Sequence, residues 1–192
     1  TGATALLFGG LTAADFLIDK ANVTQGTKVL INGATGEVGC AALQIASYLG
    51  AMITAVCRSE NHEFARNLGA RETHDYRDGI PRGQWDVVMD IAGTLPWKRA
   101  RQLIAPGGIL LPVTASLGAL MGASLFPRRN QERRISAATS RDGPDAMRRL
   151  LSLYASGALQ PVVSATFPLS RIADAHALVD TGHKRGAVVI TM

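Results

Sequence analysis

Short strand-like runs alternate along the chain with segments whose apolar residues recur at helical spacing. The strand-like runs, most of them rich in Val, Ile and Leu, lie at 28–31, 53–57, 72–76, 86–92, 109–113 and 134–139. Between them, helical segments are predicted at 38–49, 61–70, 96–104 and 144–156. This alternation is typical of an α/β fold, in which helices cover both faces of a doubly wound parallel sheet.

The two ends of the chain follow other patterns. Residues 1–20 are apolar and helix-like, and the chain begins with Thr1, so we expect it to be part of a longer protein. After Gly157, a residue suited to ending a helix, the chain is extended and marked by proline at 159–169. A further helix is predicted at 170–179 and a last strand at 186–192. We therefore expect the C-terminal segment, residues 158–192, to belong to another domain than residues 1–157.

Composition narrows the class of protein. With 192 residues, 47% of them apolar, the chain can bury one substantial core, and no apolar run approaches the roughly 18 residues of a membrane span. Cys40 and Cys57 lack the spacing of a zinc site or a disulfide framework, so we expect no metal and a cytoplasmic protein. The net charge of +5 comes largely from arginines between Arg128 and Arg149. Without interleaved aromatic residues, this cluster favours a solvated face over a nucleic-acid partner.

The stretch "ATGEVG" at 34–39 joins the first strand to the helix that follows it. Gly36 lets the backbone approach a pyrophosphate, Gly39 lets the helix pack closely on the strand, and the helix N-terminus faces the anion. Ala34 stands where the commonest fingerprint has its first glycine. A tight turn without a ligand is the alternative, but the strand before it, the helix after it and the second strand favour a Rossmann-like nucleotide site.

The end of the second strand bears on which nucleotide would bind. An NAD site places a carboxylate there for the ribose hydroxyls, whereas an NADP site needs cations and hydroxyl donors for the 2′-phosphate. The chain has Arg58 and Ser59 at this point, followed by Glu60. These residues favour NADPH over NADH, although Glu60 could still reach a ribose.

Four stretches carry a family resemblance: "GGLTAADFLIDKANVTQGTKVLINGATGEVGCAALQIA", "NLGA…HDY", "PGGILLPV" and "TGHKRGAVVITM". They resemble the zinc-independent quinone oxidoreductase branch of the medium-chain dehydrogenase/reductase superfamily, and the resemblance covers nearly the whole chain. In that family a GroES-like catalytic domain precedes the dinucleotide-binding domain, and the last strand returns to complete the catalytic domain. The resemblance implies that 1–157 is the dinucleotide-binding domain, that 158–192 is the returning segment, and that the catalytic domain is absent from this chain.

The resemblance also implies a set of contacts with the cofactor. Thr12 matches a position near the nicotinamide side of the pyrophosphate. Arg58 and Tyr76 fall where the family often contacts the 2′-phosphate, and Ala92 and Gly93 fall where it contacts the adenosine. The remaining contacts are those of the phosphate turn and of the strand ends near the nicotinamide: Ala34, Thr35, Gly36, Glu37, Val38, Val113, Thr114 and Ala137.

The activity that the resemblance implies is direct hydride transfer from NADPH to a quinone or to the β-carbon of an enone, without zinc. NADP-using relatives often carry Ser and Lys after the second strand, where this chain has Arg58 and Asn61. His62, His74 and Asp75 are interpreted as structural or solvated groups, so no catalytic residue is assigned. Two other functions stay open: a dinucleotide-binding module without turnover, and an NAD(P)-dependent alcohol dehydrogenase.

Two further expectations concern partners and position. The apolar run at 117–126 is either a buried helix or a partner surface, and relatives often dimerise, so we expect a homodimer of the intact protein acting on a small quinone, enone or carbonyl substrate. His183 has a better case than His176 for lying near the cofactor.

Overall fold

The computed structural model of the protein describes residues 2–114, 134–136 and 143–192. In chain order its elements are α1 (Gly2–Ala14), η1 (Asp15–Lys20), β1 (Lys28–Asn32), α2 (Glu37–Tyr48), β2 (Met52–Cys57), η2 (Ser59–Asn61), α3 (His62–Asn67), β3 (Glu72–Asp75), η3 (Tyr76–Asp78), β4 (Trp85–Asp90), α4 (Trp97–Leu103), β5 (Ile104–Pro112), β6 (Arg134–Ile135), α6 (Pro144–Ala155), β7 (Val163–Pro168), η4 (Leu169–Arg171), α7 (Ile172–Asp180) and β8 (Ala187–Thr191).

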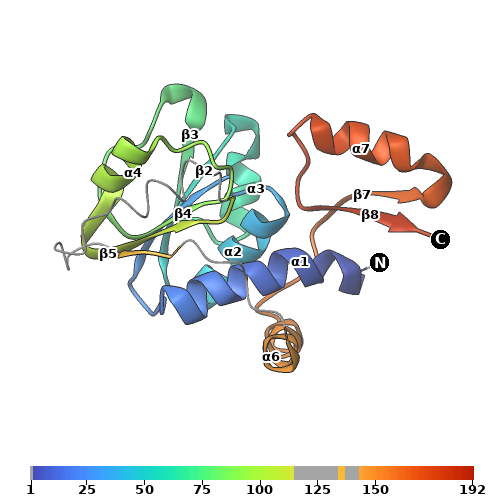
Figure 1. The fold of residues 1–192 in the computed structure, drawn as a ribbon, viewed down its shortest axis with the longest axis horizontal. Helices are drawn as coiled ribbons and strands as arrows, with labels where there is room; N and C mark the ends of the chain where they lie inside the picture. Colours follow the sequence, from blue (N-terminus) through green and yellow to red (C-terminus); the bar gives the residue numbers. More distant parts are fainter. Residues whose placement is uncertain (1, 115–133, 137–142) are drawn as a thin grey trace.

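Six strands form one parallel sheet in the order β3-β2-β1-β4-β5-β6 (Figure 1). Leu30 in the centre of β1 pairs with Thr54 of β2 on one side and with Val88 of β4 on the other. The strand order reverses direction between β1 and β4. This is the doubly wound arrangement predicted from the sequence, and ligands of such sheets bind at the carboxyl ends of the strands beside the reversal.

The central strands β1, β2 and β4 are buried on both faces of the sheet. Successive residues of a strand point to opposite faces, so each of these strands contributes to two cores. Val29 and Ile31 of β1 pack in a large core with residues of α1, α2 and α6, whereas Leu30 packs in a second core that includes Ala100 and Leu103 of α4. The continuous apolar runs of the central strands follow from this burial on both faces.

Helix α1 continues into η1, a π-helical turn, and packs along α2. By length and composition alone Gly2–Lys20 could cross a membrane, and 56% of its apolar window is buried inside the structure. Within η1 the buried Asp15 pairs with Lys20 at 2.7 Å, and Arg149 of α6 pairs with Asp19. Buried core helices of globular proteins pass the same test of length and composition as membrane spans do.

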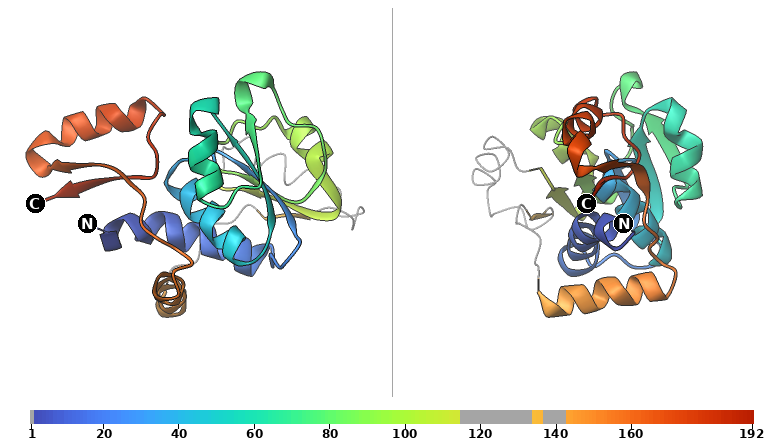
Figure 2. Two further views of the ribbon diagram at one scale, coloured as in Figure 1. Left: turned by 180° about the vertical axis from the view of Figure 1, so that it is seen from behind. Right: turned by 90° about the vertical axis from the view of Figure 1, so that its right-hand side faces the viewer.

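Strands β7 and β8 form a separate two-stranded parallel sheet, with α7 running between them in the chain. Figures 1 and 2 show this unit, in orange and red, standing beside the main sheet without extending it. Ala187 and Val189 of β8 are buried and pack with Ala5 of α1.

Two sequence expectations differ from the structure. The strand expected at 109–113 is longer, because β5 already begins at Ile104 and bulges against β4, where Gly108 lies so close to the Asp86 carbonyl that a Cβ would meet it at 2.7 Å. The helix expected at 170–179 begins with the 3₁₀ turn η4, and α7 starts at Ile172. The sixth strand is described only as β6, and both the run at 117–126 and Ala137 lie outside the described residues.

Candidate cofactor site

A cleft of about 1320 Å³ opens at the carboxyl ends of β1, β2, β3 and β4. This volume exceeds that of most small-ligand pockets, so an extended molecule could lie in it. The lining includes the turn after β1, the loops after β2, β3 and β4, and part of the C-terminal segment. The cleft therefore lies at the point of the sheet where its order reverses.

The turn after β1 is held close to its neighbours by glycines. Gly33 has a φ of +82°, and a Cβ there would lie 3.0 Å from the backbone nitrogen of Ala92. A Cβ on Gly39 would lie 2.3 Å from the Gly33 carbonyl oxygen, so α2 can start this close to the strand only without a side chain. Gly33, one residue before Ala34, thus supplies the left-handed conformation of the turn, and the N-terminus of α2 faces the cleft.

The loop after β4 is fixed by a buried polar network. Asn32 donates through its side-chain amide to Oδ1 of Asp90 at 2.7 Å and to Oγ1 of Thr94 at 2.9 Å. The Asp90 carboxylate also accepts from the backbone N–H groups of Gly93 at 2.9 Å and Leu95 at 3.2 Å. One carboxylate therefore organises the loop that forms this wall of the cleft.

At the end of β2, Arg58 turns toward the end of β3. Its Nε donates to the phenolic oxygen of Tyr76 at 2.7 Å, and both residues line the cleft. Within the described part of the chain, the Arg58 guanidinium forms no ion pair with a carboxylate. This arginine is therefore available to an anionic group of a ligand.

A second arginine, Arg77 of η3, forms hydrogen bonds with two carboxylates. Its Nε donates to Asp75 at 3.0 Å, and its Nη1 and Nη2 donate to Glu60 at 3.3 and 3.1 Å. The hydrogen bonds from Arg77 hold the pKa of the buried Asp75 carboxyl well below its usual range. The backbone N–H of Glu60 and the charge of Arg77 lower the pKa of Glu60 as well.

The C-terminal segment forms a further part of the cleft lining and contacts the loop that follows Arg58. The backbone N–H of Gly186 donates to the Thr35 carbonyl at 3.0 Å, so this segment is joined to the turn itself. Arg185 donates through Nε to the Asn61 side-chain oxygen at 2.6 Å and through Nη2 to the Glu60 carbonyl at 3.0 Å. Lys184 and His183 also line the cleft.

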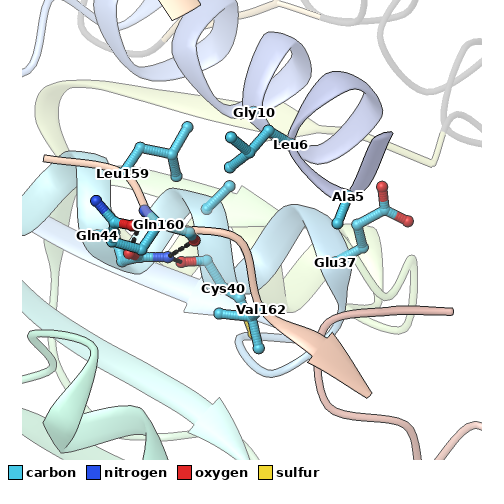
Figure 3. Close-up of a pocket in the computed structure, with 10 residues that line it drawn as sticks. Ala5, Leu6, Gly10, Glu37, Cys40, Gln44, Leu159, Gln160 and Val162 are labelled. Atoms are coloured by element: carbon cyan, nitrogen blue, oxygen red, sulfur yellow. Dashed lines mark hydrogen bonds between the residues drawn. The ribbon is translucent and has the colours of Figure 1, made fainter. Parts of the chain in front are cut away.

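A second anchor fixes the C-terminal segment beside α2. The Gln44 side chain donates to the Gln160 carbonyl at 3.1 Å and accepts from the Gln160 backbone N–H at 2.9 Å, as Figure 3 shows. Cys40 and Val162 lie next to this pair, around a cavity of only about 10 Å³. Burial raises the pKa of the Cys40 thiol to about 12, so this cysteine is not a reactive thiolate at neutral pH.

The structure brings part of the predicted set of site residues to the cleft. The lining includes Thr35, Gly36, Arg58, Tyr76, Ala92 and Thr114. Ser59 is tied to the same wall, since its N–H donates to Asp75 at 2.7 Å. The others, Thr12, Ala34, Glu37, Val38, Gly93 and Val113, lie next to these elements but not in the lining, and Ala137 lies outside the described residues.

Sequence reasoning missed several groups of the cleft. Asn32 and Thr94 belong to the network around Asp90, and Lys184 and Arg185 come from a segment distant in sequence. The strand-end position of Asn32 and the two cations before Gly186 were the available signals.

Most of this chain matches the model of a known protein family. The model of the family described as zinc-binding dehydrogenase matches residues 68–190, which is more than half of the chain. The chain belongs to this dehydrogenase family. The family match agrees with the resemblance found in the sequence.

Curated relatives of this dehydrogenase chain are longer than the chain itself. The chloroplast envelope quinone oxidoreductase homolog of Arabidopsis thaliana is 27% identical over 200 residues, which cover 98% of this chain and 61% of the relative. The mitochondrial NAD(P)H oxidoreductase RTN4IP1 of Bos taurus is 28% identical over 221 residues, covering 100% and 56%. The chain thus spans less than two thirds of the length of these relatives.

Solved structures match the same part of longer proteins. The quinone oxidoreductase of Coxiella burnetii is 27% identical, with a TM-score of 0.83, and covers 99% of this chain and 60% of its own. A structure described as an NAD-dependent alcohol dehydrogenase is also 27% identical, with a TM-score of 0.80. These matches confirm the fold class for the dehydrogenase chain.

The family description mentions zinc, so we asked whether the residues of this chain fit a metal ion. Within 2–114, 134–136 and 143–192, no three His, Cys, Asp or Glu side chains lie close enough together to hold one. Cys57 lies at the cleft, but burial raises the pKa of its thiol to about 11, which disfavours a thiolate ligand. The described residues therefore do not fit a zinc site.

Proposed function

We propose that this chain is the cofactor-binding part of an NADPH-dependent oxidoreductase that transfers hydride to a quinone or enone without zinc. The observation that carries the proposal is one cleft that contains both the glycine turn and the Arg58–Tyr76 pair. The names of the relatives, quinone oxidoreductase and NAD(P)H oxidoreductase, support the same class of reaction.

The residues of the cleft fit a dinucleotide. The turn at Gly33 and the N-terminus of α2 suit a pyrophosphate, because backbone N–H groups and a helix dipole both favour an anion there. Arg58 suits the 2′-phosphate, for which an arginine offers several N–H donors. Lys184 and Arg185 of the C-terminal segment add positive charge to the cleft lining.

In this proposal the bound nicotinamide supplies the hydride, and the chain positions it. Asn32 and Asp90 hold the loop after β4 rigid, so that Ala92 can form a fixed wall. Thr114 donates to the Ile91 carbonyl at 2.6 Å and thereby ties the end of β5 to the same loop. Hydride transfer depends on such orientation and on exclusion of water more than on a protein nucleophile.

The organisation of the whole protein is part of the proposal. Residues 1–157 form its dinucleotide-binding domain, and residues 158–192 complete a catalytic domain that other residues of the protein supply. The substrate is a small quinone, enone or carbonyl compound, and the intact protein is a cytoplasmic homodimer that binds neither nucleic acid nor membrane. The exposed strand β7 supports this division, because a covering domain would bury it.

Calorimetric titration of the chain with NADPH and with NADH tests the cofactor proposal. We expect tighter binding of NADPH, and we expect Arg58→Ala to weaken NADPH binding by roughly tenfold to a hundredfold while NADH binding changes little, because a hydrogen bond to a charged group is lost. Arg66→Ala is the matched control, since Arg66 lies on α3, contacts Thr73 and does not line the cleft.

Two outcomes would contradict the proposal. Binding of neither nucleotide would mean that the turn only packs a strand against a helix in this chain. Equal loss of NADPH and NADH binding in Arg58→Ala would remove Arg58 from the 2′-phosphate site and leave the choice of cofactor to other residues.

A further inference from the structure

One carboxylate in the cleft lining disfavours the binding of NADPH. Among the described lining residues of the cleft, Glu60 is the one that carries a carboxylate, and it lies on the same loop as Arg58. A carboxylate at this point of a Rossmann-like fold accepts hydrogen bonds from ribose hydroxyls and repels a 2′-phosphate. If Glu60 alone determined the choice of cofactor, the site would favour NADH over NADPH.

We propose that Arg77 is a positioning residue that sets the preference for NADPH by holding and neutralising Glu60. Its guanidinium donates to both oxygens of Glu60 and, through Nη2, to the Ser59 hydroxyl at 2.8 Å. Arg77 does not line the cleft, so it acts on the ligand through Glu60. This inference rests on the proposed function and assigns the specificity of the same site.

The geometry keeps Arg77 in place without help from the ligand. Its backbone N–H and its Nε both donate to the buried carboxylate of Asp75, at 2.8 and 3.0 Å, and Nη2 donates to the same carboxylate at 2.6 Å. The planar guanidinium can therefore face Asp75 with one side of its fork and Glu60 with the other. A lysine at this position could not hold both carboxylates in this way.

The ion pair between Arg77 and Glu60 matters more for cofactor specificity than for the stability of the fold. Arg77 and Glu60 are 50% and 60% exposed, and ion pairs of such exposure contribute little to folding. Once Arg77 is removed, however, the Glu60 carboxylate of the cleft lining loses its ion pair and faces a ligand phosphate that carries up to two negative charges. Arg58 on the same loop and Arg185, which donates to the Glu60 carbonyl, would then be the arginines of the cleft lining left near that phosphate.

The preference can be measured with two fragments of the cofactor, adenosine 2′,5′-bisphosphate and adenosine 5′-monophosphate, titrated calorimetrically into the chain. Their affinity ratio reports the 2′-phosphate alone and does not depend on the nicotinamide half of the cleft. We expect Arg77→Met to lower this ratio about tenfold and Arg77→Met with Glu60→Gln to restore most of it, because a neutral amide no longer repels the phosphate. Arg148→Met, which removes an exposed arginine paired with Asp145, should leave the ratio unchanged.

Each other outcome would overturn the inference in a recognisable way. An unchanged ratio in Arg77→Met would show that Arg77 does not set the preference, while the proposed function would stand. A fall that Glu60→Gln does not reverse would mean that Arg77 acts by a route other than Glu60. If neither fragment binds to the unchanged chain, the proposed function itself fails and the inference fails with it. Thermal unfolding of each variant checks that the fold is retained.

Discussion

The two parallel sheets of this chain bury their strands very differently. In the six-stranded sheet every residue of β1 after Lys28 is buried, and β2 and β4 are almost as enclosed. In the two-stranded sheet no residue of β7 is fully buried, and Val163 remains 38% exposed. A parallel sheet is stable when helices cover both faces, and two strands alone cannot provide such a core.

The two sheets contribute to the cleft in different ways. The six-stranded sheet holds the cleft on rigid strand ends, whereas the two-stranded unit contributes side chains from a less enclosed support. Hydrogen bonds of Gly186, Gln160 and Arg185, together with the packing of β8 on α1, tie the second unit to the first. The difference in burial predicts that equal substitutions in the two sheets will have unequal effects.

The largest effect should come from breaking the turn of the main sheet. Gly39→Ala places a methyl group 2.3 Å from a backbone carbonyl that cannot move freely, and we expect it to lower the free energy of unfolding by about 3 kcal/mol or more. Urea unfolding followed by circular dichroism measures this change. Gly143→Ala is the control, because its Cβ would meet open space. Equal effects of the two substitutions would refute the argument from close packing.

A smaller effect on the free energy of unfolding should distinguish the six-stranded sheet from the two-stranded sheet. Val29→Ala removes two methyl groups from a fully buried site in β1, and we expect a loss of about 2 kcal/mol of unfolding free energy. The same substitution at Val163 in β7 should cost less than about 0.5 kcal/mol, because that side chain is partly solvated. A comparable cost at both positions would mean that β7 is as well packed as β1.

The smallest effect should depend on pH. The pKa of Asp75 is lowered in the folded protein, so its contribution to stability is present above its unfolded pKa of about 4 and is lost as the pH falls through the folded value. Asp75→Asn should therefore lower the melting temperature at pH 7, and its difference from the unchanged chain should shrink toward pH 2. Asp174→Asn is the matched control, because Asp174 pairs with Arg171 on the surface of the two-stranded unit. A difference for Asp75→Asn that does not shrink between pH 5 and pH 2 would contradict this account.

Much of the fold could be predicted because local pattern and tertiary burial agree. The apolar runs of β1, β2 and β4 are buried on both faces, so their composition alone marks them as central strands. The start of β5 escaped prediction because proline and glycine usually mark a turn, whereas here glycine lets a bulged strand approach β4. The π-helical turn η1 has no comparable sequence signal.

The candidate site was predictable only where its residues follow a strand directly. Gly36 and Arg58 come after β1 and β2, and parallel strands bring such positions to one edge. Arg185 could not be placed from sequence, because its position depends on how the C-terminal segment docks. Arg77 could not be assigned its partner Glu60 either, since Glu60 lies in η2 after β2, and only the sheet brings η2 next to the end of β3.

The hydrogen bond from Gly186 to Thr35 has a consequence for the order of synthesis. The turn after β1 leaves the ribosome before Gly186 is made, so the backbone that completes one of its edges is added later. Domains generally acquire structure as they emerge, and contacts between distant residues form late. The cleft of a nascent chain therefore stays open on one side until translation has passed residue 186, and until then only the ends of the main strands and their loops form it.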